Sequence, residues 1–319
     1  MDLRHDWTAS EARTIHDTPL FELIDRARSV HRESFPEGAV QLCTLISVKT
    51  GGCPEDCAYC PQSSHYETPV QGQKMLSVDD VVDAARRAKR AGATRFCMGA
   101  AWREVKSGSA FDNVLEMVSR VKAEGLETCV TLGMVNAEQA GALKRAGLDA
   151  YNHNLDTSRE HYKSIISTRS FDERLSTLRH VRDAGISVCT GGIIGMGEGI
   201  DDRCRLLVQL ATLEPHPESV PINALVRVPG TPLEHLPPVE PLELVRMIAT
   251  ARIMMPQSKV RLSAGRTELS REAQLMCLFA GANSIFYGDQ LLTTGNPETS
   301  TDDALIREAG LAREAPAAL

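Results

Sequence analysis

Apolar positions along the chain follow two alternating periods. Seven segments place apolar residues three or four positions apart, as on one face of a helix: 78–91, 110–124, 136–146, 171–184, 201–213, 242–254 and 268–280. Between them lie short strand-like runs, centred near Leu45, Phe96, Cys129, Asn152, Cys189, Asn223, Arg261 and Ile285. Eight strands alternating with helices predict an α/β protein, a (β/α)8 TIM-type barrel. An open doubly wound sheet is the alternative fold.

The two ends of the chain break this alternation. Residues 1–40 predict an N-terminal helical cap, because Leu20, Leu23, Ile24 and Ala27 fall at helical spacing before a turn at 36–38. The barrel itself is assigned to 41–295. Residues 296–319 are polar and rich in alanine, which predicts a surface helix and a loose C-terminal tail. No GxGxxG follows an early strand, so a dinucleotide-binding Rossmann domain is excluded.

Side chains alternate between the two faces of a strand, which divides the strand residues into two sets. The set predicted to face the helices is apolar: Phe96, Met98, Val130, Leu132, Val188, Ile222, Ala224, Val226, Val260 and Leu262. The set predicted to face the interior is polar: Cys97, Cys129, Thr131, Asn152, Asn154, Asp156, Cys189, Asn223, Arg261 and Ser263. Barrel interiors are ordinarily filled by Val, Ile and Leu, so this one is predicted to hold a polar prosthetic group.

Each interior cysteine taken alone is more often a small core residue than a ligand. Their shared phase with polar neighbours favours a functional role for Cys97, Cys129 and Cys189. By the same criterion Cys43, Cys204 and Cys277 are interpreted as ordinary core or helix cysteines. With nine cysteines in 319 residues, an odd number, metal ligands and buried thiols are favoured over a disulfide framework.

The charge and hydrophobicity of the chain limit the kinds of molecule that it is expected to bind. The chain has 35 basic and 42 acidic residues, a net charge of −7, and no basic run, so neither nucleic acid nor an anionic membrane surface is predicted. A small-molecule substrate fits better. The N-terminus is too polar for a signal peptide and no apolar stretch approaches a membrane span, which predicts a cytoplasmic protein.

Three thiols stand within eight residues, at Cys53, Cys57 and Cys60, in a Gly/Pro loop directly after the first strand. Thiolates are soft ligands that suit iron-sulfur clusters, Cu(I) or zinc. No fourth ligand lies nearby, and an open metal position is typical of a catalytic site. A zinc knuckle or a disulfide pair is the alternative, although no second CxxC or HxxxH with zinc spacing occurs.

The CxxxCxxC spacing, with Tyr59 before the last cysteine, resembles the signature of radical S-adenosyl-L-methionine (radical SAM) enzymes. Over nearly the whole chain the sequence resembles one family of them, the biotin synthases. The matching stretches are 49–57 with 59–64, 96–103, 127–129, 151–157, 189–192 and 261–266. Many radical SAM enzymes share the first of these stretches, whereas the others are specific to this family.

The resemblance implies two iron-sulfur clusters. Cys53, Cys57 and Cys60 would hold a [4Fe-4S] cluster that binds S-adenosyl-L-methionine. Cys97, Cys129, Cys189 and Arg261 would hold an auxiliary [2Fe-2S] cluster. A guanidinium ordinarily has no lone pair to offer, so the residues alone would make Arg261 a counterion. Its role as a ligand rests on the resemblance.

The resemblance also implies the small-molecule contacts. Tyr59 would contact the adenine of the cofactor, Asn154 and Asp156 the ribose, and Arg174 the carboxylate, with Gly191 and Ile193 at a cofactor-binding strand end. For the substrate, Asn154 and Asn223 would bind the ureido ring, and Thr293 and Thr294 the carboxylate. On composition alone, strand-end capping or turn formation explains these amides and hydroxyls equally well.

The implied activity is conversion of dethiobiotin to biotin, by radical insertion of sulfur between C6 and C9 with the auxiliary cluster as sulfur donor. The implied partners are a flavodoxin- or ferredoxin-type reductant, cluster-assembly proteins and a second copy in a homodimer. Another radical SAM barrel enzyme is one alternative. From a different class, a non-catalytic iron-sulfur electron-transfer or carrier protein is another, although a carrier needs neither eight βα units nor an open iron site.

Overall fold

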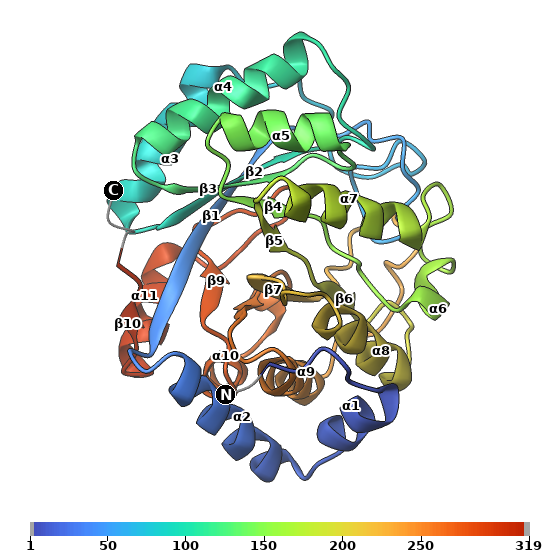
Figure 1. Ribbon diagram of the computed structural model, residues 1–319, viewed down its shortest axis with the longest axis vertical. Helices are drawn as coiled ribbons and strands as arrows, with labels where there is room; N and C mark the ends of the chain where they lie inside the picture. The colour runs from blue at the N-terminus through green and yellow to red at the C-terminus, as the bar shows by residue number, and fades with distance from the viewer. Residues whose placement is uncertain (1–2, 316–319) are drawn as a thin grey trace.

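A computed structural model describes residues 3–315 as one closed barrel of parallel strands (Figure 1). Around the barrel the strands are β1 (Ala39–Lys49), β2 (Arg95–Ala100), β3 (Glu127–Thr131), β4 (Ala150–Asn152), β5 (Ser187–Cys189), β7 (Ser219–Ala224), β8 (Lys259–Leu262) and β9 (Ser284–Phe286). β9 pairs with β1 and closes the circle. The predicted barrel is therefore confirmed, and the open doubly wound sheet is wrong.

The predicted helices surround the barrel as α3 (Val78–Ala91), α4 (Ser109–Ala123), α5 (Ala137–Arg145), α7 (Phe171–Asp183), α8 (Ile200–Ala211), α9 (Pro241–Met254) and α10 (Arg271–Phe279). Several begin where a polar side chain accepts a hydrogen bond from the first helical turn, as Ser77 does before α3 and Ser270 before α10. Two short elements, α6 (Arg159–Tyr162) and the 3-10 helix η1 (Arg266–Glu268), were not predicted because single turns carry no periodicity.

The fifth barrel position is divided into two strands where one was predicted. β6 (Gly192–Ile194) pairs with β7 in the same register as β5, with Cys189 opposite Ser219 and Gly192 opposite Ile222. The strand is interrupted because the chain leaving β4 bonds to it, with the Leu155 and Asp156 N–H groups both donating to the Gly191 carbonyl. This crossing carries Asp156, in the left-handed region at φ 68°, to the end of the barrel.

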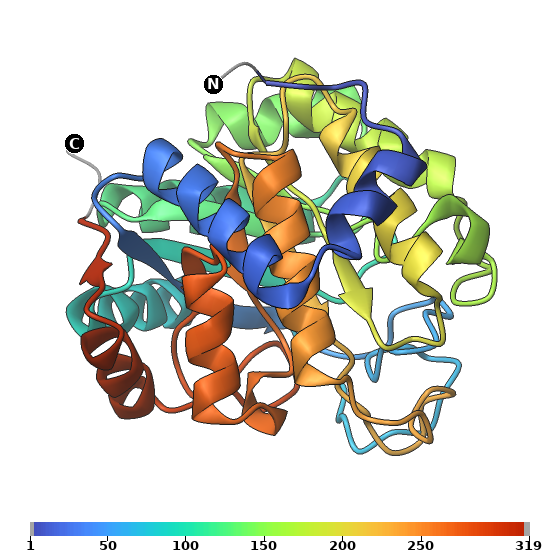
Figure 2. The same cartoon turned by 90° about the horizontal axis from the view of Figure 1, so that it is seen from below.

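The N-terminal extension consists of α1 (Ala9–His16) and α2 (Leu20–Ser34), which confirms the predicted helical region. Both helices lie across the outside of the barrel, α1 against α8 and α9, and α2 against α9 (Figure 2). Arg246 of α9 links them, since its Nη1 donates to the carbonyls of His16 (2.7 Å) and Thr18 (2.8 Å). Within residues 3–315 no helix is long and apolar enough to span a lipid bilayer.

The C-terminal segment contains the predicted helix, α11 (Thr299–Glu308), followed by the short strand β10 (Ala312–Arg313). β10 pairs with the start of β1, so the chain is held in place rather than loose up to residue 315. Residues 316–319 of the predicted tail lie outside the described residues. The fully buried pair Arg266 and Asp302 joins α11 to the barrel.

The inward-facing residues form layers, and the lowest layer closes the barrel. Arg95 donates to Glu127 through Nε (2.8 Å) and Nη2 (2.6 Å), and Gln41 donates to the same carboxylate (2.9 Å). These groups lie at the start of their strands, where they fill the N-terminal end of the barrel. Thiols and amides occupy the layers above them, toward the C-terminal end, where active sites of such barrels sit.

Candidate functional site

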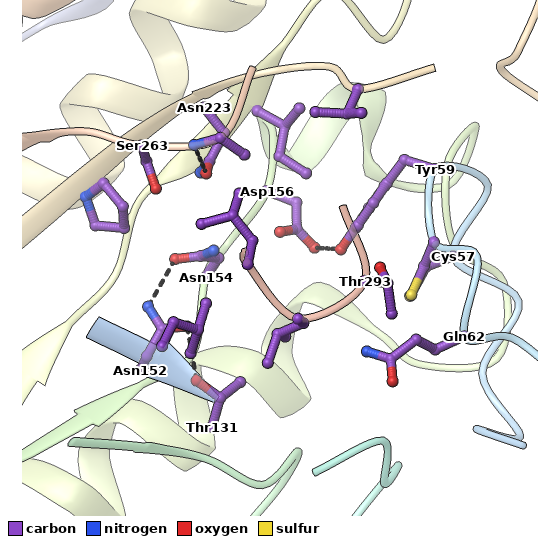
Figure 3. Close-up of a pocket in the computed structure, with 18 of the residues that line it drawn as sticks. Cys57, Tyr59, Gln62, Thr131, Asn152, Asn154, Asp156, Asn223, Ser263 and Thr293 are labelled. Carbon is purple, nitrogen blue, oxygen red and sulfur yellow. Dashed lines mark hydrogen bonds between the residues drawn. The ribbon is translucent and has the colours of Figure 1, made fainter. Parts of the chain in front are cut away.

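A cavity of about 320 Å³ lies inside the barrel at the C-terminal ends of the strands (Figure 3). Its lining includes nearly all the side chains that the sequence singled out, from the cysteine loop and from the strands. These are Cys53, Cys57, Tyr59, Cys60, Cys97, Cys129, Thr131, Asn152, Asn154, Asp156, Arg174, Ile193, Asn223, Arg261, Ser263, Thr293 and Thr294. Cys189 and Gly191 are not among its lining residues.

The cysteine loop is fixed by its own backbone. The Cys53 N–H donates to the Gln62 carbonyl (2.9 Å) and the Cys60 N–H to the Cys57 carbonyl (2.9 Å). The loop leaves β1 through Gly51, at φ 73°, where a Cβ would come within 2.9 Å of the Gly72 backbone. The three thiols therefore line the cavity from one short, well-anchored turn.

Burial raises the pKa of Cys57 to about 11 and that of Cys60 to about 12. These thiols hold their protons in the metal-free protein, and binding iron as thiolates releases those protons. The buried guanidinium of Arg169, which the sequence analysis missed, lines the same wall and lowers the pKa of Cys57. Its Nε has no hydrogen-bond partner among the described residues. No motif marked Arg169, which lies beyond the strands in the loop before α7.

The side chains of Tyr59 and Asp156 point toward each other in the cavity (Figure 3), and Arg174 of α7 reaches the same carboxylate. The Tyr59 hydroxyl donates to Asp156 Oδ2 (2.7 Å), and Arg174 Nη2 lies 2.5 Å from the same oxygen. Arg174 is held by Tyr162, whose hydroxyl accepts from Nε at 2.6 Å. Both contacts of Asp156 use Oδ2, which leaves Oδ1 available to a ligand hydroxyl. Three of the six residues predicted to hold the cofactor thus form one hydrogen-bonded group, in which Asp156 and Arg174 are buried and Tyr59 is partly buried.

Replacing Asp156 with asparagine is expected to weaken binding of S-adenosyl-L-methionine by roughly tenfold to a hundredfold, because a charge-assisted acceptor is lost and Arg174 loses its counterion. Isothermal titration of the cofactor into reconstituted protein measures the change. Asp172→Asn is the matched control, since Asp172 pairs with Arg159 on the surface. Unchanged affinity in Asp156→Asn would contradict the assignment of this carboxylate to the cofactor.

The interior thiols lie in one layer below the amides. Cys97 and Cys129 are opposite each other on β2 and β3, and the interaction between the two neighbouring thiols raises the pKa of Cys97 and lowers that of Cys129. Arg261 on β8 donates from Nη1 toward Cys189 Sγ at 3.8 Å. All four residues are buried. The structure therefore brings together the three cysteines and the arginine predicted as one ligand set.

Cys43 belongs to the same layer, and its interpretation as an ordinary core cysteine needs correction. Its Sγ lies 3.2 Å from Arg261 Nη2, and its side chain packs with Cys97 and Cys129. The signal was present in the sequence: Cys43 stands two residues before Leu45, which pairs with Cys97 across β1 and β2. Residues two apart on a strand share a face. Cys204 and Cys277 are buried helix residues on α8 and α10, as interpreted.

The donors around these thiols fit an iron-sulfur cluster. Besides soft thiols, the interior holds buried hydrogen-bond donors without partners among the described residues, including Arg95 Nη1, Ser219 Oγ and Ser263 Oγ. Such donors suit the sulfide and thiolate sulfurs of an anionic cluster, and hydrogen bonds to those sulfurs tune its potential. All nine cysteines are free, so the disulfide alternative is wrong. Within residues 3–315 no three His, Cys, Asp or Glu side chains are placed to hold a single metal ion.

The predicted substrate amides are partly engaged with the backbone. Asn223 Nδ2 donates to the Gly192 carbonyl (2.9 Å) and its Oδ1 accepts from the Ala264 N–H (3.1 Å). Asn154 Oδ1 accepts from Asn152 Nδ2 (3.2 Å; Figure 3) and from the Gly191 N–H (3.2 Å). Each amide keeps part of its hydrogen-bonding capacity for a ligand. The backbone hydrogen bonds of Asn154 and Asn223 show that both residues also cap strand ends, which was the alternative explanation.

Three predicted positions differ from expectation in their surroundings. A Cβ on Gly191 would lie 2.0 Å from the Pro221 carbonyl oxygen, so this glycine is needed for close contact with β7, and its role at the cofactor stays a prediction. Ala224 and Val226 were assigned to the helix-facing set but line the cavity. β7 ends at Ala224, and strict alternation ends with it. Thr293 and Thr294 line the cavity from the loop after β9, as predicted for a substrate site.

Comparison with known proteins agrees with this geometry. The family model of the radical SAM superfamily matches residues 47–210, and that of the biotin and thiamin synthesis associated domain matches 221–312. The biotin synthase of Sorangium cellulosum is 72% identical over 315 residues, which cover 99% of this chain and 90% of that protein. The chain belongs to the biotin synthase family.

A second member of the biotin synthase family, from Myxococcus xanthus, is 62% identical over 98% of this chain and 90% of its own length. Two solved structures share the fold at low identity. Methylornithine synthase has a TM-score of 0.80 at 21% identity, covering 97% of this chain and 94% of that one. A maturase of the [FeFe]-hydrogenase has a TM-score of 0.81 at 17% identity, covering 95% and 71%.

Proposed function

We propose that this chain converts dethiobiotin to biotin, inserting sulfur between C6 and C9 in a reaction that depends on S-adenosyl-L-methionine. The observation that carries the proposal is a single cavity lined by two sets of thiols, one from the loop after β1 and one from the barrel strands. Membership in the biotin synthase family supports it. An electron-transfer or carrier protein has no use for a second thiol set beside an enclosed organic-ligand site.

Cys53, Cys57 and Cys60 would hold a [4Fe-4S] cluster, and Cys97, Cys129, Cys189 and Arg261 a [2Fe-2S] cluster. When bound, these groups supply radical cleavage of unactivated C–H bonds and the sulfur atom, chemistry that no side chain provides. The soft donor sets and the unpartnered donors beside them support the assignment.

The protein's own residues position the reactants and exclude water. The group formed by Tyr59, Asp156 and Arg174 would orient the cofactor through its ribose and carboxylate. Asn154 and Asn223, pinned by their backbone contacts, would present fixed amide groups to the ureido ring. The layer of Arg95 and Glu127 closes the far end of the barrel, so reactive species are shielded from solvent on that side.

The proposal extends to partners and location. A flavodoxin- or ferredoxin-type reductant would deliver electrons, cluster-assembly proteins would load the iron, and the chain would act as a cytoplasmic homodimer. Family membership supports these assignments. We also propose the division into a helical extension at 1–40, a barrel at 41–295 and a tail from 296, although the second family model continues to residue 312.

The test uses Cys129→Ala in anaerobically reconstituted protein supplied with dethiobiotin, the cofactor and a reductant. Wild type is expected to form biotin and 5′-deoxyadenosine. The variant should form no biotin while still releasing 5′-deoxyadenosine, because Cys129 lies in the interior thiol layer and outside the cysteine loop. Quantitative chromatography measures both products.

Cys204→Ala is the matched control, since Cys204 is equally buried but lies on α8 outside the cavity. It should retain both activities. Biotin formation at the wild-type rate by Cys129→Ala would refute the sulfur-donor role of the interior site. Release of 5′-deoxyadenosine without biotin by wild type would instead point to another radical SAM reaction.

A further inference from the structure

The interior of the barrel holds a fourth thiol that the proposed function does not use. Cys43, on β1, is fully buried and packs with Cys97, Cys129 and Ala150. Cys43 lies on the inner face of β1. The other three thiols of the layer lie on neighbouring strands and are candidate cluster ligands. A buried thiol so placed is close to whatever those thiols bind.

Arg261 joins Cys43 to the ligand set. Its Nη2 lies 3.2 Å from Cys43 Sγ, its Nη1 lies 3.8 Å from Cys189 Sγ, and its Nε donates to Ser284 Oγ at 2.9 Å. The guanidinium therefore lies between two thiols and is anchored by a third contact. Of these two thiols, Cys43 is the nearer to the guanidinium.

Independent observations mark this layer as a site for an anionic group. Arg95 Nη1, in the closing layer and opposite Cys43 in register, is buried and has no hydrogen-bond partner among the described residues. Ser219 Oγ, opposite Cys189 in register, is also buried and unpartnered. Two unused donors beside the thiols are what thiolates and sulfides would satisfy.

The two candidate donors differ in chemistry. A guanidinium carries five N–H groups and no lone pair, so it can bind iron only after losing a proton. A thiolate is a soft ligand and the ordinary one for iron-sulfur clusters. Resting on the proposed function, we propose that Cys43 is an alternative fourth ligand of the auxiliary cluster, able to bind the iron in place of Arg261.

The exchange balances without an oxidant or a reductant. The Fe–N bond to Arg261 breaks and an Fe–S bond to Cys43 forms. The thiol proton of Cys43 passes to the departing guanidine nitrogen across their contact, which restores the guanidinium. The cluster then has four thiolate ligands, and Arg261 remains beside it as a counterion.

The test compares clusters in reconstituted Arg261→Ala, Cys43→Ser and the double variant. Iron and sulfide per chain, Mössbauer spectra and resonance Raman spectra of the Fe–S stretches report on each cluster independently of turnover. Arg261→Ala is expected to keep both clusters, with Raman bands shifted toward four-thiolate ligation. The double variant should lose the [2Fe-2S] iron and sulfide and keep the [4Fe-4S] signal, whereas Cys43→Ser alone should keep both.

Arg261→Ala combined with Cys277→Ser is the matched control, because Cys277 is fully buried on α10 away from this layer. It should behave as Arg261→Ala does. Retention of the auxiliary cluster in the Cys43 double variant overturns the inference, as does its loss in Arg261→Ala when the [4Fe-4S] signal and circular dichroism show a folded chain. Failure of the proposed function is distinct, since wild type itself would then lack the second cluster.

Discussion

Cys57→Ala is expected to lose the [4Fe-4S] cluster and all release of 5′-deoxyadenosine, and with it all formation of biotin. Cys57 is the middle thiol of the loop and lines the cavity beside Tyr59 and Cys60. With only three thiols in the loop, removal of one leaves an iron without a protein ligand, and the loop offers no replacement. Mössbauer spectra and product chromatography after anaerobic reconstitution measure the two losses.

The auxiliary cluster should survive in Cys57→Ala, because its thiols lie on separate strands below the loop. This retention separates a specific ligand loss from general unfolding. Cys277→Ala, which removes an equally buried thiol from α10, should keep both clusters and full activity. Cleavage of the cofactor by Cys57→Ala at the wild-type rate would show that this loop is not the radical-generating site.

Asp302→Asn is expected to lower the free energy of unfolding by about 3–5 kcal/mol, because it leaves the fully buried guanidinium of Arg266 without its counterion. Burial raises the pKa of Asp302 even though the guanidinium lowers it, which indicates a large desolvation cost. Urea denaturation followed by circular dichroism measures the loss. Since α11 is joined to the barrel by this pair, its detachment should accompany the change.

Glu308→Gln is the matched control on the same helix. Glu308 pairs with Arg271 at the surface, where side chains are 38% and 59% exposed, so the expected loss is under about 1 kcal/mol. Replacing both buried partners, as Arg266→Met with Asp302→Leu, should restore much of the stability. Equal stability of Asp302→Asn and wild type would mean that the pair contributes nothing to the folded state.

Much of the barrel could be predicted because its strands and helices carry opposite periodicities. Alternation along β2 and β3 correctly placed Cys97 and Cys129 inside, and the register between the strands confirms it. The same alternation, extended along β1 from Leu45 toward the N-terminus, places Cys43 on the same inner face, because Leu45 pairs with Cys97. Strands of only two or three residues, such as β6 and β10, are too short to show an alternating pattern and could not be found in this way.

The site residues likewise fall into those that a local sequence pattern can predict and those whose position depends on loops or on the folded chain. Cys53, Cys57 and Cys60 are close in sequence, so their spacing alone predicts a shared site. Arg169 was missed because its position is set by the loop before α7, and loops carry no periodic pattern. The contacts of Asn223 with Gly192 and Ala264 depend on neighbouring strand ends, which only the folded chain brings together.

β1 is the longest strand among residues 3–315, and it runs from Gln41 in the closing layer past Cys43 to Lys49. Four residues after Lys49 comes Cys53, so one continuous segment of the chain connects the two thiol sites. Because a strand rises about 3.3 Å per residue, the number of residues in β1 contributes directly to the distance between the two thiol sites. One inserted residue would lengthen the strand and turn the side chains beyond it to the opposite face, unless a bulge absorbed the extra residue. The spacing of the two proposed thiol sites thus depends on the length of one strand, which already contains one irregularity, a register shift between Ser47 and Lys49.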